Sequence, residues 1–344
     1  VNLVKGKPMI KSLILKNYGP LAAIEWKGLG KVNLVIGNNG TGKTFLLKAA
    51  YSAVKASEEY KRGDEPRKLS EILSDKLYWT FQTEKLGDLV AKGQTGKLEF
   101  RMEMDEGTLA YSFGESTVRT LLDIIEPSQS RSSNSLFLPE KEILTLYKVI
   151  IDSRERAKLF GFDDTYYDLA KVISIGPKKG RNYQEFSDAR RSIADVVGGK
   201  VYQDENDRWL YKKGRYLFPI SVASEGVKKL AILDTLLGNH YLDNRSVIFI
   251  DEPEAALHPE AISQFMETIY VLSESGIQFF VSTHSYFVVK GLSLLARKHK
   301  ESMPVLSLEN GVATIDDLQN GYPDNPIVRE SVRLYEQEVE LSLS

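Results

Sequence analysis

The octapeptide at residues 37–44, GNNGTGKT, has the spacing G-x-x-x-x-G-K-T. Glycines at this spacing let the backbone curl so that several N–H groups point inward, and the N-terminus of a following helix adds a positive dipole end. Lys43 would reach the β- and γ-phosphates of a bound triphosphate, and the Thr44 hydroxyl would be a ligand of the bridging Mg²⁺. The stretch therefore predicts a P-loop. Its expected nucleotide-binding residues are Asn38, Asn39, Gly40, Thr41, Gly42, Lys43, Thr44 and Phe45.

Two adjacent carboxylates, Asp251 and Glu252, follow the apolar run SVIFI at residues 246–250. Such a run is typical of a strand buried on both faces, and a carboxylate pair at its end needs a cation or a proton nearby. We expect Asp251 to hold Mg²⁺, directly or through water. Glu252 is then the candidate general base for the water that attacks the γ-phosphate. By itself, Asp-Glu-Pro also fits the start of a plain loop.

Two further residues could take part in nucleotide binding, but the local sequence around each is less specific. Ser224 precedes a segment with apolar residues on one face, so it is a credible helix N-cap. His284 follows the β-rich run at 278–283, where an imidazole beside a γ-phosphate would sense it through a hydrogen bond. A capped helix and a surface histidine are the ordinary alternatives.

In chain order, the segments 37–44, 224–229, 251–259 and 282–285 resemble the Walker A, signature, Walker B and switch-histidine motifs of ABC-type ATPases. The match is closest to the branch of overcoming-lysogenization-defect (OLD) nucleases and the ATPase subunits of the Septu and PARIS phage-defence systems. Residues 136–142, LFLPEKE, are also similar to a segment common in that branch. The motifs cover roughly 9–56 and 221–300, and the resemblance is thin over 57–220.

The resemblance implies ATP and Mg²⁺ as cofactors and hydrolysis by Lys43, Glu252 and His284. It also implies that Ser224 and Gly226 complete the nucleotide site of a neighbouring protomer, in a homodimer that encloses ATP. Gln82 resembles the glutamine that contacts Mg²⁺ in ABC heads, and Tyr18 is a candidate to stack on adenine. An exposed glutamine at the end of a strand and a packed tyrosine are the alternatives.

Departures from the wider family narrow the function. The Leu-Ser-Gly-Gly-Gln signature of transporters and the long coiled coil of SMC proteins are both missing. Because only about 60 residues follow His284, we expect no Toprim nuclease domain. The four histidines, at positions 240, 258, 284 and 299, cannot form a His-rich nuclease motif. The sequence thus favours an ATPase that acts through a separate effector.

Composition excludes several classes of protein. Across 344 residues, 45 Lys and Arg oppose 47 Asp and Glu, so any nucleic-acid binding needs a local basic patch. The absence of cysteine excludes disulfides and thiolate metal sites and suits a reducing cytosol. No apolar run is long enough to span a bilayer, so we expect a soluble, cytoplasmic protein without membrane partners.

The elements that must position these residues follow from hydrophobic periodicity. We expect an edge strand at 10–15 paired with 22–26, a helix at 44–61, and antiparallel strands at 77–81, 97–104 and 109–113. Residues 115–198 look helical and charged, with a mobile loop at 128–134, and 200–220 look like a meander. Beyond residue 221, strands alternate with helices, as in a parallel sheet.

The expected fold is α/β: an ABC-type P-loop ATPase head with a parallel core sheet, an antiparallel sheet and a helical insertion. The expected division is 9–113 for the N-terminal part of the head, 114–199 for the insertion and 200–344 for the C-terminal part. We expect the head to dimerise around ATP and to control a nuclease or toxin in phage defence. The rival hypotheses are a DNA-maintenance ATPase that binds DNA directly and an ATP-gated scaffold with slow turnover.

We expect the effector or the trigger to bind to the insertion. It carries a basic cluster that would suit such contacts, although a solvated surface and a structural cover for the antiparallel sheet are the alternatives. The cluster consists of Lys178, Lys179, Arg181, Arg190 and Arg191.

Overall fold

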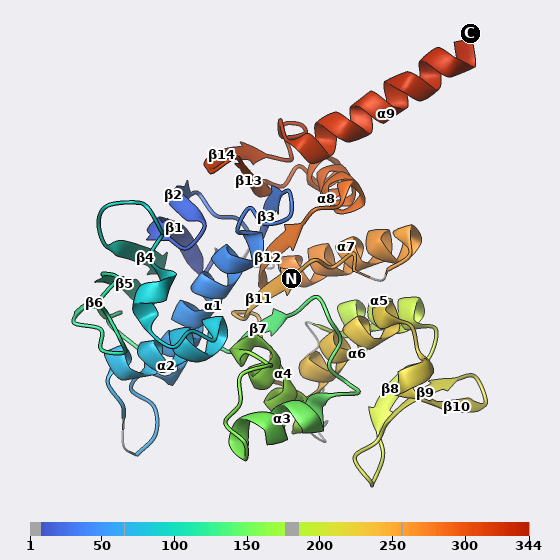
Figure 1. The fold of residues 1–344 in the computed structure, drawn as a ribbon. Coiled ribbons are helices and arrows are strands. Elements are labelled where there is room, and N and C mark those ends of the chain that lie inside the picture. The colour runs from blue at the N-terminus through green and yellow to red at the C-terminus, as the bar shows by residue number, and fades with distance from the viewer. Residues whose placement is uncertain (1–7, 65, 176–185, 256, 344) are drawn as a thin grey trace.

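The central element is a six-stranded sheet with the order β14-β13-β3-β12-β11-β7, seen in a computed structural model that describes residues 8–64, 66–175, 186–255 and 257–343 (Figure 1). All neighbouring strands pair in parallel except β13 and β14. The strands of this sheet are β3 (Val32–Gly37), β7 (Ser135–Leu138), β11 (Val247–Asp251), β12 (Gln278–Thr283), β13 (Pro304–Glu309) and β14 (Val312–Asp317).

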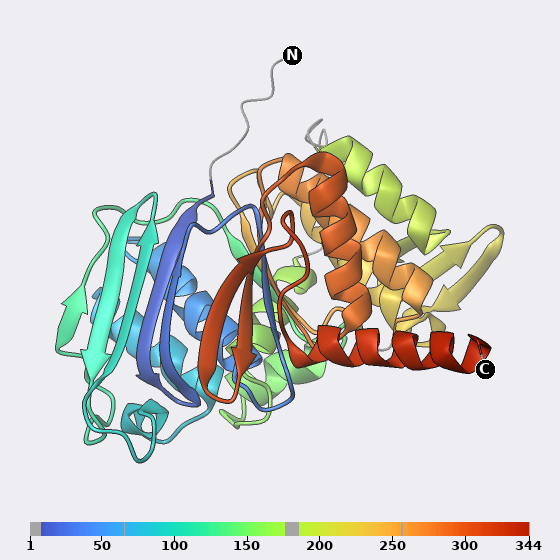
Figure 2. The ribbon, with the colours of Figure 1, turned by 90° about the horizontal axis from the view of Figure 1, so that it is seen from above.

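A five-stranded antiparallel sheet, β2-β1-β4-β5-β6, forms a second layer on one side of the molecule (Figure 2). β1 pairs with both β2 and β4, so the prediction of an edge strand at its position is wrong. The hairpin of β1 and β2 and the pairing of β4 with β5 are as expected. The strands are β1 (Ile10–Tyr18), β2 (Leu21–Lys27), β4 (Leu98–Met104), β5 (Gly107–Phe113) and β6 (Asp123–Ile125).

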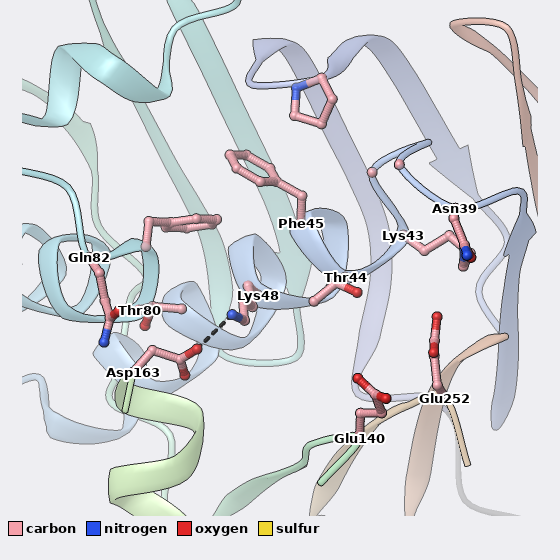
Figure 3. A pocket seen from close by; sticks show the side chains of 14 residues that line it. Asn39, Lys43, Thr44, Phe45, Lys48, Thr80, Gln82, Glu140, Asp163 and Glu252 are labelled. Atoms are coloured by element: carbon pink, nitrogen blue, oxygen red, sulfur yellow. Dashed lines mark hydrogen bonds and ion pairs between the residues drawn. The ribbon is translucent and has the colours of Figure 1, made fainter. Parts of the chain in front are cut away.

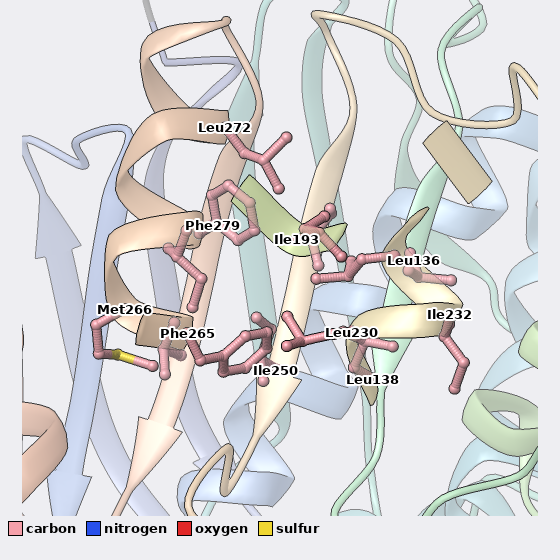
Figure 4. Packing of buried hydrophobic residues seen from close by; sticks show 14 of the residues in the cluster. Leu136, Leu138, Ile193, Leu230, Ile232, Ile250, Phe265, Met266, Leu272 and Phe279 are labelled. Carbon is pink, nitrogen blue, oxygen red and sulfur yellow. The ribbon is translucent and has the colours of Figure 1, made fainter. Parts of the chain in front are cut away.

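The helices cover the central sheet on both faces. One face shares a core with α1 and the antiparallel sheet, and the other packs on α6, α7 and α8. Neighbouring residues of a strand therefore enter different cores: Phe280 faces α1, and Phe279 packs with Phe265 of α7 (Figure 4). The helices are α1 (Lys43–Glu59), α2 (Leu69–Phe81), α3 (Tyr147–Glu155), α4 (Asp164–Ser174), α5 (Ser187–Val197), α6 (Glu225–Gly238), α7 (Pro259–Glu274), α8 (Tyr286–His299) and α9 (Pro326–Leu343).

The expected meander is confirmed as a three-stranded sheet, β10-β9-β8, that projects from the body beside α5 and α6 (Figure 1). Its strands are β8 (Lys200–Gln203), β9 (Trp209–Lys213) and β10 (Tyr216–Pro219). A short 3₁₀ turn, Ile220–Val222, joins β10 to the start of α6.

The strand expected at 77–81 is wrong, because these residues form the last turns of α2. Leu69, Ile72, Leu73 and Leu77 are buried at helical spacing, and this longer apolar stripe outweighs the short aromatic alternation.

The expectation for 115–198 is corrected in part, since β6 extends the antiparallel sheet and β7 pairs with β11 in the central sheet. The division into domains stays a prediction. The loop expected to be mobile at 128–134 is anchored, because Arg131 is fully buried and ion-paired with Glu106. Lys178, Lys179 and Arg181 lie outside the described residues. Arg190 and Arg191 form ion pairs with Asp234 and Asp188.

Candidate functional site

The P-loop runs from the end of β3 to the start of α1, and its glycines adopt backbone conformations that other residues rarely take. Gly42, the N-cap of α1, has φ = 96°, and a Cβ atom there would lie 2.6 Å from Cδ2 of Leu21. The Lys43 ammonium donates to the carbonyl oxygens of Gly37 at 2.9 Å and Asn38 at 3.0 Å. The loop therefore curls around its own lysine, as a phosphate cradle requires.

Lys43 is buried, with 4% of its surface exposed. Burial lowers the pKa of its ammonium, and the nearby carboxylates of Glu252 and Asp251 oppose this shift. A phosphate group would supply the negative charge that a buried ammonium lacks.

Asp251, at the end of β11, lies beside the P-loop. Its Oδ1 accepts hydrogen bonds from the hydroxyl of Thr44, at 3.0 Å, and from the hydroxyl of Ser282 on β12. Burial raises the pKa of the Asp251 carboxyl, and the two hydrogen bonds oppose the shift. A carboxylate and a hydroxyl oxygen thus meet at a partly buried point, and both are ligands that Mg²⁺ accepts while keeping several waters.

Glu252 and His284 meet where β11 and β12 end. Nδ1 of His284 lies 3.0 Å from Oε1 of Glu252, and Glu252 has φ = 46° in the left-handed region. Such a conformation is costly for a residue other than glycine and is often found at functional sites. Its backbone N–H donates to the carbonyl of Ser282, which fixes the turn that presents the carboxylate.

Glu254 supports this arrangement. Its Oε1 accepts from the Thr283 hydroxyl at 2.6 Å and from the backbone N–H of His284 at 3.1 Å. The carboxylate thereby ties the loop after β11 to the loop after β12. Sequence reasoning gave Glu254 no role, although its position three residues after Asp251 was a usable signal.

An open cavity of about 720 Å³ lies in front of the P-loop (Figure 3). Lys43, Asn39 and Glu252 lie at one end, and Gln82 and Asp163 lie at the other. The further lining residues include Gly40, Gly42, Thr44, Phe45, Lys48, Thr80 and Glu140. The geometry therefore brings together most of the residues that the sequence predicted for nucleotide binding.

Among the lining residues that were not predicted to be part of the site, three are charged: Lys48, Glu140 and Asp163. Glu140 follows β7, which pairs in parallel with β11, so both strands end at the same edge of the sheet. Lys48 lies one turn after Thr44 and donates to Asp163 at 2.6 Å, where Asp163 is the N-cap of α4. The helical position of Lys48 was a usable signal, whereas Glu140 and Asp163 depend on tertiary contacts.

The structure alters two hypotheses that the sequence suggested about the nucleotide site, those for Tyr18 and Gln82. Tyr18 is fully buried, with its hydroxyl 2.9 Å from that of Tyr111, so the hypothesis that it stacks on adenine is wrong. Gln82 ends a helix and not a strand, with φ = 49°. It lines the cavity at the end opposite Glu252, and its role as a Mg²⁺ ligand stays a prediction (Figure 3).

The signature segment is separate from this cavity within one chain. Ser224 caps α6 by accepting from the backbone N–H of Val227 at 3.4 Å, which confirms the predicted cap. Ser224 and Gly226 line another cavity, of about 260 Å³, together with Leu257 and His258.

α6 nevertheless contacts the turn after β11 through Lys229. The buried ammonium of this residue lies 3.4 Å from the backbone carbonyl of Glu252, and burial lowers its pKa. The signature helix and the Walker B turn are therefore in direct contact.

The arrangement fits ATP with Mg²⁺ on three observations. The glycine cradle leaves open space at Gly40, the Thr44–Asp251 pair offers hard oxygen ligands, and Glu252 faces the cavity beside them. Asn38 and Thr41, which were also predicted to bind nucleotide, belong to the P-loop itself, where the Thr41 hydroxyl donates to the Asn38 carbonyl. No helix in the described ranges combines the length and apolarity that crossing a bilayer requires.

Comparisons with known proteins show which sequences and structures this chain resembles. A stretch of 56 residues is 48% identical to the Old nuclease of Escherichia phage P2, over 16% of this chain but only 8% of that protein. A structure of the SmcHead bound to the C-winged helix domain of ScpA is 15% identical over 90% of this chain and 97% of that chain, with a TM-score of 0.53.

A second Smc head domain, from Pyrococcus furiosus, has an extended coiled coil and is bound to the C-terminal domain of ScpA. It is 13% identical over 96% of this chain and 99% of that chain, with a TM-score of 0.50. At these identities the likeness shows the fold, which is the expected ABC-type ATPase head. Residues 32–290, from β3 into α8, match one family, and the chain belongs to it: the AAA domain, putative AbiEii toxin, Type IV TA system family.

Proposed function

We propose that this protein is a Mg²⁺-dependent ATPase whose catalytic residues are Lys43, Glu252 and His284. The observation that carries the proposal is the convergence of three neighbouring parallel strands. β3, β12 and β11 end at one edge of the sheet and deliver the P-loop, His284 and the Asp251–Glu252 pair to a single place. Ligands of open parallel sheets bind at this edge.

Each residue has a role that its surroundings support. Lys43 leaves the loop carbonyls to contact the β- and γ-phosphates, and the backbone N–H groups of 38–45 surround them. Thr44 and Asp251 would hold Mg²⁺, which would supply positive charge beside the phosphate oxygens. Glu252 orients the attacking water and accepts its proton, while His284, held beside Glu252, is placed to contact the γ-phosphate.

We further propose that two chains enclose ATP, with Ser224 and Gly226 of one facing the P-loop of the other. The support is that these residues and Lys43 line different cavities of one chain. A second helix N-terminus would then add donors and positive dipole to the γ-phosphate only when another protomer brings it.

The biological setting that we propose is cytoplasmic phage defence, in which ATP state controls a separate nuclease or toxin. The family description names a putative AbiEii toxin, and the 56-residue match is to a phage-encoded nuclease of the OLD type. The residues outside the minimal head, 114–199 in our division, stay the proposed place of contact with that effector.

The chemical proposal is tested with Lys43→Ala and Glu252→Gln. Lys43→Ala should lose nucleotide binding, while Glu252→Gln should bind ATP with Mg²⁺ and lose turnover by about 10²-fold or more, which is about 2.7 kcal/mol of transition-state stabilisation. Glu260→Gln, an exposed change in the first turn of α7, is the matched control. Near-normal hydrolysis by Glu252→Gln would remove its assigned role.

A further inference from the structure

The meander carries an unusual set of cations at the end that holds the turn between β9 and β10. Lys200 on β8, Lys212 and Lys213 on β9, and Arg215 in the turn are all exposed. We call these four residues, together with Tyr202 and Tyr216, the basic meander. In the described part of the chain, no carboxylate forms an ion pair with any of the four cations.

Lys200 and Lys212 lie directly opposite each other in the antiparallel pairing of β8 and β9. Side chains at such positions leave the same face of the sheet, and like charges there are destabilising. The acidic residues of the meander, Asp204, Glu205 and Asp207, lie at the other turn, between β8 and β9, where Asp204 is already paired with Arg208. The lysine pair thus lacks a counter-charge that an anionic ligand would supply.

Elsewhere on the surface, exposed lysines of the strands pair with carboxylates. On β1 of the antiparallel sheet, Lys16 contacts Glu99 at 3.3 Å and Lys11 contacts Asp105 at 3.1 Å. The chain as a whole has a net charge of −2. The basic meander is therefore a local concentration of uncompensated charge and not a consequence of overall composition.

Each face of the meander carries a tyrosine beside cations: Tyr202 shares a face with Lys200 and Lys212, and Tyr216, directly opposite Lys213, lies on the other face. Tyr216 is 57% exposed and Tyr202 is 38% exposed. The Arg215 guanidinium lies 5.2 Å from the centre of the Tyr216 ring. A cavity of about 560 Å³ adjoins Lys200 and Tyr202. Its other side is lined by Arg190 and Arg191 of α5, which are ion-paired with Asp234, also in the lining, and with Asp188. Flat rings beside cations and a recess suit an unpaired base with its phosphate.

We propose that the basic meander binds single-stranded nucleic acid. The bound strand passes around the end of the meander that holds the turn between β9 and β10, with Lys200, Lys212 and Tyr202 on one face and Lys213 and Tyr216 on the other. The cations contact phosphates, and the two tyrosines stack on exposed bases. Only Ile220–Val222 and Ala223 separate β10 from Ser224, and Ile220 is buried, so a ligand on the meander is connected directly to the start of the signature helix. The expected consequence, which rests on the proposed function, is that a bound strand changes the rate of ATP turnover.

The binding test uses fluorescence anisotropy of the full chain with labelled (dT)20 and (U)20. If the four cations each contact one phosphate, the logarithm of the affinity should fall against the logarithm of salt concentration with a slope of about −2.8. The Lys212→Glu/Lys213→Glu variant should roughly halve this slope and weaken binding. Tyr216→Ala should weaken binding at least about fivefold. Lys68→Glu/Lys298→Glu, which changes two exposed lysines elsewhere, is the control with equal charge.

The same anisotropy assay compares alternative ligands: single-stranded DNA, single-stranded RNA, duplex DNA and polyglutamate. The (dT)20 and (U)20 arms distinguish DNA from RNA, and tighter binding of either one supports the proposal. Duplex DNA should bind more weakly, because paired bases cannot stack on the tyrosines. Equal binding of duplex, or of polyglutamate with matched charge, would overturn the assignment to single strands. Unchanged affinity in both the Lys212→Glu/Lys213→Glu and Tyr216→Ala variants would overturn the surface itself.

The coupling is measured separately as ATP turnover with and without the strand. The strand should change the turnover of the wild-type chain and leave that of Lys212→Glu/Lys213→Glu unchanged. Binding is also measured with Lys43→Ala, which is expected to lose nucleotide. Strand binding by Lys43→Ala would keep the surface assignment even if the ATPase proposal failed, whereas unchanged turnover of an active wild-type enzyme would overturn the coupling.

Discussion

Replacing Asp251 with asparagine should stabilise the nucleotide-free protein while abolishing its turnover. Asp251 is 7% exposed, and burial raises the pKa of its carboxyl, so its ionised form is unfavourable in the folded state. Thr44 and Ser282 both donate to Oδ1, which an asparagine retains. The substitution therefore removes a buried charge beside Glu252 and keeps both hydrogen bonds.

The expected gain in stability is estimated from what replacing a destabilising functional residue usually yields. Stabilisation by removing such a group is about 0.5–2 kcal/mol. With an unfolding entropy of about 2.1 cal/mol/K per residue, 344 residues give about 0.7 kcal/mol/K. Each kcal/mol then shifts the midpoint of unfolding by about 1.4 °C, so Asp251→Asn should melt about 1–3 °C higher than the wild type.

The pH dependence has a definite sign. Because the folded-state pKa of Asp251 lies above its ordinary value of 3.8, the native state binds more protons than the unfolded state between the two values. The wild type therefore loses stability from this group as pH rises through that window. The advantage of Asp251→Asn should be absent at lower pH, grow across the window and stay constant above it.

Differential scanning calorimetry with and without Mg·ATP provides the measurement. At about 100 times its dissociation constant, a ligand should stabilise the wild type by about 2.7 kcal/mol, or about 4 °C on the same scale, and should stabilise Asp251→Asn much less. Thr268→Ser, on the buried side of α7, provides a control change away from the cavity. A lower melting temperature for Asp251→Asn in nucleotide-free buffer would refute the argument, because the carboxylate would then be favourable without its cation.

Two further predictions concern the loop at 128–134 and the assembly. Arg131→Met should cost up to about 3–5 kcal/mol in urea unfolding, because it leaves the buried Glu106 with only the half-exposed Arg245, at 3.6 Å, as a cationic partner. Arg131→Met/Glu106→Leu should recover most of this loss. A loss of stability near zero for Arg131→Met would contradict the role of the buried ion pair. Mixing Lys43→Ala with Ser224→Arg chains should restore up to about a quarter of the active sites if dimers form at random; a mixture as inactive as each variant alone would indicate sites completed within one chain.

The parts of the site that depend only on residues close together in the chain could be predicted from the sequence. The P-loop follows from glycine positions between an apolar strand and a helix, and the Asp251–Glu252 pair follows from a fully apolar strand. His284 and the Ser224 cap were also placed correctly at a strand end and a helix start. These features are local, because strand ends, caps and glycine turns are encoded within a few residues.

The residues that reach the site from distant parts of the chain could not be predicted, because their positions depend on how the whole chain packs. Residues 135–138 form a strand because β11 offers them a partner, and this pairing carries Glu140 to the nucleotide cavity. Asp163 reaches Lys48, and Arg131 is buried against Glu106, through contacts between segments far apart in the chain. Periodicity reports which face of an element is apolar, but the choice of partner depends on the packing of the whole chain, and no local pattern contains that information.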